Sequence, residues 1–177
     1  MSSELRVDKI IPTSGVPATG GGGVVQVVHG EYGSEVTTTS TSFVDTGVTA
    51  TITPKFNTSK ILVIIDQPYH MSRSTNVCSG GFKVLRGSTE IATLNGTGAS
   101  GGTAPYACYY EAGGASNMSI IDRWSFMILD EPASTSSLVY KVQMACNTSN
   151  NSGRIRAQYS GTSGYQKGHI SLMEVSA

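Results

Sequence analysis

The chain has few charged residues and no excess of either sign. Only 14% of its 177 residues are charged, and 12 lysines and arginines balance 12 aspartates and glutamates. Such a balance leaves no electrostatic footprint for nucleic acid or for an anionic membrane surface. We therefore expect no nucleic-acid partner.

Cysteine and long apolar stretches are also scarce. Cys78, Cys108 and Cys146 are odd in number and form no C-x-x-C pair, so we expect buried free thiols. The N-terminus opens polar, and no apolar stretch reaches the ~18 residues that span a bilayer. The sequence predicts a protein made in a cytoplasm, with neither signal peptide nor membrane insertion.

Metal-binding motifs are missing, and so is a nucleophile elbow. His29, His70 and His169 are isolated, and none lies in H-x-H or H-E-x-x-H. Asp66 and His70 would share a strand face, but at roughly 13 Å apart they are too distant to hold one metal ion. The pattern G-x-S-x-G occurs at Gly98-Ala-Ser-Gly-Gly102, but in a predicted polar loop that lacks the strand-to-helix context of a nucleophile elbow. We expect structural or rim roles for the histidines, with no metal and no cofactor.

Paired carboxylates are the one enzymatic pattern that the chain offers. Asp122, Asp130 and Glu131 could supply two acids for glycoside cleavage, which needs carboxyl groups ~5 to 10 Å apart. The simpler interpretation is a polar strand end beside Pro132. The prediction is a protein that is not an enzyme and has no catalytic residue.

A run of four glycines divides the chain into two parts. Gly20-Gly-Gly-Gly23 favours neither helix nor strand, because glycine loses the most conformational entropy on ordering. We expect an extended N-terminal attachment segment over residues 1–19, a linker over 20–23 and one domain over 24–177.

The composition of the domain and the spacing of its apolar runs are typical of β-structure. It is rich in serine and threonine, and short β-branched runs are fenced by turn residues. Alternation predicts strands over 48–53 and 138–146, a hairpin over 80–93 with its turn at 86–89, and a central strand, bulged or bent near Asp122-Arg123, over 118–129. The predicted fold is an all-β jelly-roll or Greek-key sandwich of about eight to ten strands.

One predicted strand is apolar on both faces. The run Ile61-Leu-Val-Ile-Ile65 calls for cover on two sides, whereas a two-layer sandwich covers one. We therefore expect oligomerisation, with Ile61, Val63 and Ile65 at a subunit interface.

Three tyrosines are the best recognition candidates. Tyr106, Tyr109 and Tyr110 follow a long polar loop, and tyrosine combines an apolar ring with a hydroxyl group that suits sugar or protein contacts. We predict receptor contact here, although alternation would send one of Tyr109 and Tyr110 inward.

Several stretches, taken in order, resemble bacteriophage virion proteins described as tail-fibre-like, which are common in phages of aquatic bacteria, including cyanobacteria. They cover nearly the whole chain and include Leu5-Arg-Val-Asp-Lys-Ile-Ile11, Thr38-Thr-Ser-Thr-Ser-Phe-Val-Asp-Thr46, Ser59-Lys-Ile-Leu-Val63, Val84-Leu-Arg-Gly-Ser-Thr89, Leu129-Asp-Glu-Pro132 and Ile170-Ser-Leu-Met-Glu-Val175. None of these motifs is catalytic.

The resemblance implies a structural virion protein, synthesised in the host cytoplasm and located on the tail or capsid surface. It implies a homotrimeric short tail fibre for host attachment, whose partner at the host surface is a glycan or protein. Docking onto another virion protein would use the N-terminal segment, through Leu5, Val7, Ile10 and Ile11. The alternatives are a capsid decoration or head-fibre protein that stabilises the shell, and a protein that binds or degrades surface polysaccharide.

Overall fold

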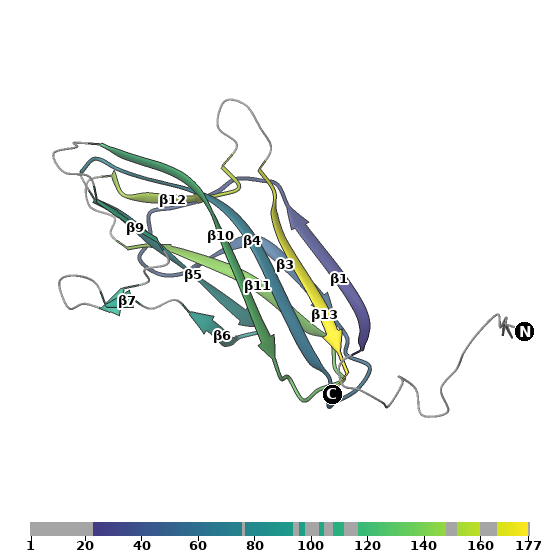
Figure 1. The fold of residues 1–177 in the computed structure, drawn as a ribbon. Coiled ribbons are helices and arrows are strands. Elements are labelled where there is room, and N and C mark those ends of the chain that lie inside the picture. Colours follow the sequence, from purple (N-terminus) through teal and green to yellow (C-terminus); the bar gives the residue numbers. More distant parts are fainter. Residues whose placement is uncertain are drawn as a thin grey trace, which may run out of the picture.

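Strands account for the regular structure of the chain. The computed structural model describes residues 23–75, 77–93, 96–97, 103–104, 108–111, 117–147, 152–159 and 166–176, and these contain no α-helix, so none that could cross a membrane (Figure 1). The predicted all-β sandwich is confirmed. Its strands are β1 (Val24–Tyr32), β2 (Val36–Thr38), β3 (Val44–Ile52), β4 (Lys60–Arg73), β5 (Val77–Arg86), β6 (Thr89–Thr93), β7 (Gly96–Thr97), β8 (Thr103–Ala104), β9 (Cys108–Glu111), β10 (Met118–Asp130), β11 (Leu138–Cys146), β12 (Arg154–Ala157) and β13 (Gly168–Val175).

Two antiparallel sheets form the layers of the sandwich. Sheet A runs β1-β13-β4-β12-β2, with β10 on the other edge of β4. Sheet B runs β3-β11-β5-β6, with β9 also paired to β5, and β7 and β8 form a separate ribbon. Long β4 accommodates β13 along its first half and β12 along its second half.

The strand order is that of a jelly roll. The strands β1 and β2 share one position in sheet A, β12 and β13 share another, and β6 and β9 share one beside β5. With each of these pairs counted as an interrupted strand, the sheet orders become 1-8-3-6 and 2-7-4-5. Successive strands cross between the sheets except at the β5–β6 hairpin, which is the jelly-roll connection pattern.

Local alternation predicted several strand faces correctly. Val48, Ala50 and Ile52 are buried on β3, and Tyr140 and Val142 are buried on β11. The hairpin also turns where expected, between β5 and β6, where Gly87 adopts a φ of +59° that favours glycine. A period of two therefore positions these core residues without tertiary information.

The doubly apolar run on β4 requires a correction. Ile61, Val63 and Ile65 are 0%, 0% and 1% exposed, because they face sheet B in the core of the same chain. They are unavailable to a second copy. The outward residues of this run are Leu62 and Ile64, so an interface on β4 would use those.

Strand β10 also differs from expectation. It forms an edge of sheet A, not a central strand, and it pairs with β4 from Met118 to Asp130 without a register shift, so there is no bulge at Asp122. Instead, the β4–β10 pair curves along its length (Figure 1). Its inward Trp124 stacks on Phe82 of sheet B, with ring centroids 4.9 Å apart, and thus ties the layers together.

A buried polar cluster joins the sheets at the end of β10. Both Asp130 carboxylate oxygens accept from Arg86 Nη1, at 2.7 and 2.6 Å, and Oδ2 also accepts from the Tyr140 hydroxyl at 2.6 Å. The neighbouring Glu131 instead pairs with Lys60 at the surface. Asp130 thus satisfies two groups that have little access to water.

Replacement of this carboxylate should destabilise the fold. We expect Asp130→Asn to lower the free energy of unfolding by about 2 to 3 kcal/mol, because Arg86 loses its counter-charge inside the protein. The matched change Glu131→Gln removes only an exposed ion pair and should cost about 0.5 kcal/mol or less. Urea denaturation measures both, and equal losses would contradict the assignment.

Candidate functional site

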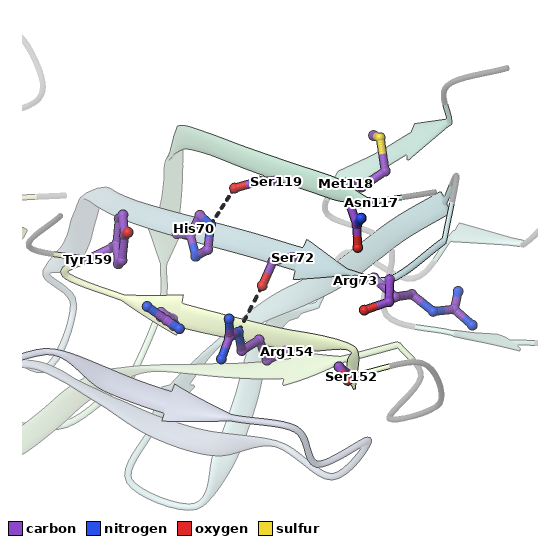
Figure 2. A pocket seen from close by; sticks show the side chains of 11 residues that line it. His70, Ser72, Arg73, Asn117, Met118, Ser119, Ser152, Arg154 and Tyr159 are labelled. Carbon is purple, nitrogen blue, oxygen red and sulfur yellow. Dashed lines mark hydrogen bonds between the residues drawn. The ribbon is translucent and has the colours of Figure 1, made fainter. Parts of the chain in front are cut away.

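The outward side chains of β4 become basic and polar toward Arg73. His70 lies opposite Arg156 of β12, and Ser72 lies between Arg154 of β12 and Ser119 of β10. These pairings place residues from distant parts of the sequence on one patch of sheet A. The patch is the rim and floor of a pocket (Figure 2).

The pocket is cationic and rich in hydroxyl groups. It encloses about 330 Å³ and is lined by three arginines, one histidine and four serines, together with Asn117, Met118 and Tyr159. Arg154 and Arg156 extend from β12 over this face, whereas the Arg73 guanidinium points away from the pocket and its Nη1 donates to the Val77 carbonyl oxygen at 3.4 Å (Figure 2). Within the described residues, no carboxylate lines it.

His70 forms the buried floor of the pocket. The residue is 5% exposed, its ring stacks on Tyr159 at a centroid distance of 4.3 Å, and its Nε2 lies 2.9 Å from Ser119 Oγ. Its Nδ1 has no hydrogen-bond partner in the described part of the chain. A buried ring nitrogen without a partner carries a desolvation penalty that a ligand could relieve.

Burial and charge keep this imidazole neutral. Burial lowers the pKa of His70 below its ordinary 6.5, and the positive charges of Arg156 and Arg154 lower it further, against a smaller opposing effect of Glu35. These surroundings therefore disfavour a positive charge on His70, whereas a bound anion would favour it.

Two arginines from β12 present guanidinium groups to the pocket. Arg154 Nε donates to Ser72 Oγ at 2.9 Å, and no described carboxylate pairs with this guanidinium. Arg156 lies over the Tyr159 ring at 5.2 Å, and its buried Nε is 3.8 Å from Glu35, too far for a hydrogen bond. Both arginines thus retain donors that could bind a carboxylate, sulfate or phosphate group.

The Ser119–His70 contact resembles two members of a hydrolytic triad but lacks the third. In serine hydrolases, a carboxylate accepts from the second ring nitrogen of the histidine and orients it. Here that nitrogen is Nδ1, which has no partner among the described residues. Among the described residues, the pair therefore lacks the carboxylate that orients the histidine in a triad.

The acids considered for glycoside cleavage do not converge. Asp122 and Asp130 lie eight residues apart on β10, roughly 27 Å at the rise of a strand, well beyond catalytic spacing. The Asp122 carboxylate accepts from Tyr110 at 2.6 Å, and this bond is the main cause of its lowered pKa. Asp130 and Glu131 are held by Arg86 and Lys60.

The tyrosines predicted for recognition lie outside the pocket. Tyr110 is half-buried against the core, and its hydroxyl group anchors Asp122. Tyr109 belongs to β9, but its side chain lies outside the described structure, as does the whole of Tyr106. The predicted docking residues Leu5, Val7, Ile10 and Ile11 also lie outside the described residues.

Sequence reasoning missed the pocket because its arginines and histidine are far apart in the chain. One signal was available: Arg154-Ile-Arg-Ala157 alternates, with Ile155 and Ala157 fully buried, so both arginines had to face outward. It missed a second group too, since β1 and β13 bring His29 and His169 together.

Comparisons with known proteins do not identify the chain. No protein-family model matches it, and no curated protein matches it. The proposal for its function therefore depends on the site.

The state of His70 should be visible in the pH dependence of stability. Because its folded pKa lies below 6.5, the unfolded chain binds more protons than the folded one just below that pH, so stability should fall as pH drops from about 7. Urea denaturation at pH 7.5 and 5.5 should show a smaller fall in His70→Gln. A fall of the same size in His70→Gln and in the wild type would contradict this assignment.

Proposed function

We propose that this chain is a non-enzymatic, tail-fibre-like virion protein that binds an anionic group of a host-surface polysaccharide. The observation that carries the proposal is the pair of guanidinium groups of Arg154 and Arg156 beside a buried His70 whose Nδ1 has no partner among the described residues. A carboxylate, sulfate or phosphate group complements this set of donors.

The remainder of the pocket suits a sugar. Its serines and Asn117 offer hydroxyl and amide groups that can exchange hydrogen bonds with a ring decorated by hydroxyls. Jelly rolls include lectins and viral proteins, but the fold hosts many functions, so this analogy adds only modest support. The resemblance to tail-fibre-like proteins supplies the virion context.

A small open pocket favours weak binding at each site. Fibres compensate by presenting several linked copies, since linkage raises avidity without strengthening a single contact. The proposal therefore includes self-association as a homotrimer, with the N-terminal segment docked on another virion protein.

The outer face of sheet A offers a surface for such association. Val27, Met173, Leu62 and Leu129 stand side by side on β1, β13, β4 and β10, and we call them the apolar row. Val27 and Leu129 are 57% and 48% exposed, and the adjoining Met127 is 66% exposed. Apolar side chains aligned across four strands favour cover by a second copy.

Removal of the guanidinium groups should weaken glycan binding. We expect Arg154→Gln with Arg156→Gln to reduce binding to acidic polysaccharide at least about tenfold, because charge-assisted hydrogen bonds are lost. Arg123→Gln is the matched control, since Arg123 lies on the same sheet but pairs with Asp66 outside the pocket. Glycan arrays and biolayer interferometry measure the effect.

Two outcomes would count against this function. Equal binding of neutral and acidic glycans, or no loss in the double variant, would remove the role of the pocket. Gold-labelled antibody found only on capsids would instead favour the decoration or head-fibre alternative.

If copies associate through the apolar row, charged substitutions there should dissociate the trimer into monomers. Light scattering at tens of micromolar should give the mass of a trimer for the wild type and of a monomer for Met127→Glu with Leu129→Glu. Val139→Glu is the control, because Val139 is also exposed, at 43%, but lies on sheet B. A monomeric wild type, or dissociation by Val139→Glu alone, would contradict this surface.

A further inference from the structure

A second cluster lies on the outer face of sheet A, where β1 pairs with β13. The register sets His29 opposite Ser171 and Glu31 opposite His169, so the two histidines are diagonal neighbours. One nitrogen from each histidine and a Glu31 carboxylate oxygen lie within 4.8 Å of one another. Imidazole and carboxylate are ligands that zinc and similar transition metals prefer.

The spacing of the two imidazoles matches shared coordination. His29 Nε2 lies 3.4 Å from His169 Nδ1, with ring centroids 5.4 Å apart. Two nitrogens bound to one tetrahedral zinc ion, each at a distance of about 2.0 to 2.1 Å, lie about 3.4 Å apart. The geometry thus needs only small adjustments to admit an ion.

The surroundings orient these ligands. His29 Nδ1 lies 3.0 Å from Ser171 Oγ, an outer-shell contact that leaves Nε2 for a metal. The backbone between His29 and Glu31 is also held, because a Cβ on Gly30 would lie 2.2 Å from the carbonyl oxygen of Thr49 on β3. Two ligands therefore project from a strand that is packed tightly against the other sheet.

Lys167 pairs with the Glu31 carboxylate. Its Nζ lies 2.5 Å from Glu31 Oε1, and both side chains are about half exposed. A divalent cation would have to displace this flexible lysine, which makes Lys167 a competitor for the site.

We propose that His29, Glu31 and His169 bind a divalent transition metal of the zinc class, with the remaining coordination position open to water. The ion would cross-link edge strand β1 to β13 near the end of β1 that is distant from Gly23. It would stabilise the folded state because the three ligands are assembled only there.

Zinc titration of the full chain tests the site. Calorimetry should show one zinc ion per chain, and zinc at a large excess over its Kd should raise Tm by about 5 °C. Cobalt(II) should give the visible absorption bands of a tetrahedral site. The variants His29→Gln and His169→Gln should each weaken zinc binding at least about tenfold.

Replacement of Lys167 should strengthen zinc binding, the opposite of the effect of the histidine variants. Lys167→Ala should bind zinc more tightly than the wild type, because the competitor for Glu31 is gone, whereas Glu31→Gln should bind it more weakly. Lys141→Ala, which breaks a comparable surface pair with Asp45, should leave zinc affinity unchanged. Absence of stoichiometric binding up to millimolar zinc, or binding that survives both histidine changes in folded protein, would overturn the proposal.

Discussion

The pairing of β4 on both edges is the constraint on which the rest of the structure depends. Strand β10 pairs with it from Ile61 to Arg73 on one edge, while β13 and then β12 pair along the other. A slip of one residue would turn Ile61, Val63 and Ile65 out to solvent and break three ladders together. The register is therefore strongly specified, and it fixes the outward residues as firmly as the core.

Those outward residues change in chemistry along the strand. Leu62 and Ile64 belong to the apolar end, Asp66 lies level with His169, and His70 and Ser72 belong to the pocket. At Leu62 the neighbouring strands contribute Met173 and Leu129, and at Ser72 they contribute Arg154 and Ser119. Self-association, metal binding and glycan binding would thus use successive parts of one sheet face and would not compete for the same residues.

The sequence predicted what depends on local alternation and missed what depends on pairing. The faces of β3 and β11 could be predicted because polar residues mark one side of each strand. The run from Ile61 to Ile65 has no such marker, so the buried set was assigned to an interface. The pocket required the ladder between His70 and Arg156, and the metal cluster required the ladder between β1 and β13. No spacing in the chain encodes either ladder.

The start of the domain and the pocket lie at opposite ends of sheet A. The Ser176 amide donates to the Gly23 carbonyl oxygen at 3.0 Å, and the Gly23 amide donates to Ser176 Oγ at 3.1 Å, so the described domain begins at the apolar end of sheet A (Figure 1). The pocket is at the other end, since Leu62 and Ser72 are separated by roughly 33 Å of strand. Copies joined through the apolar row would bring the Gly23 ends of their domains together and hold their pockets at the far end. Convergent anchors with several distant binding sites are the geometry that multivalent attachment requires.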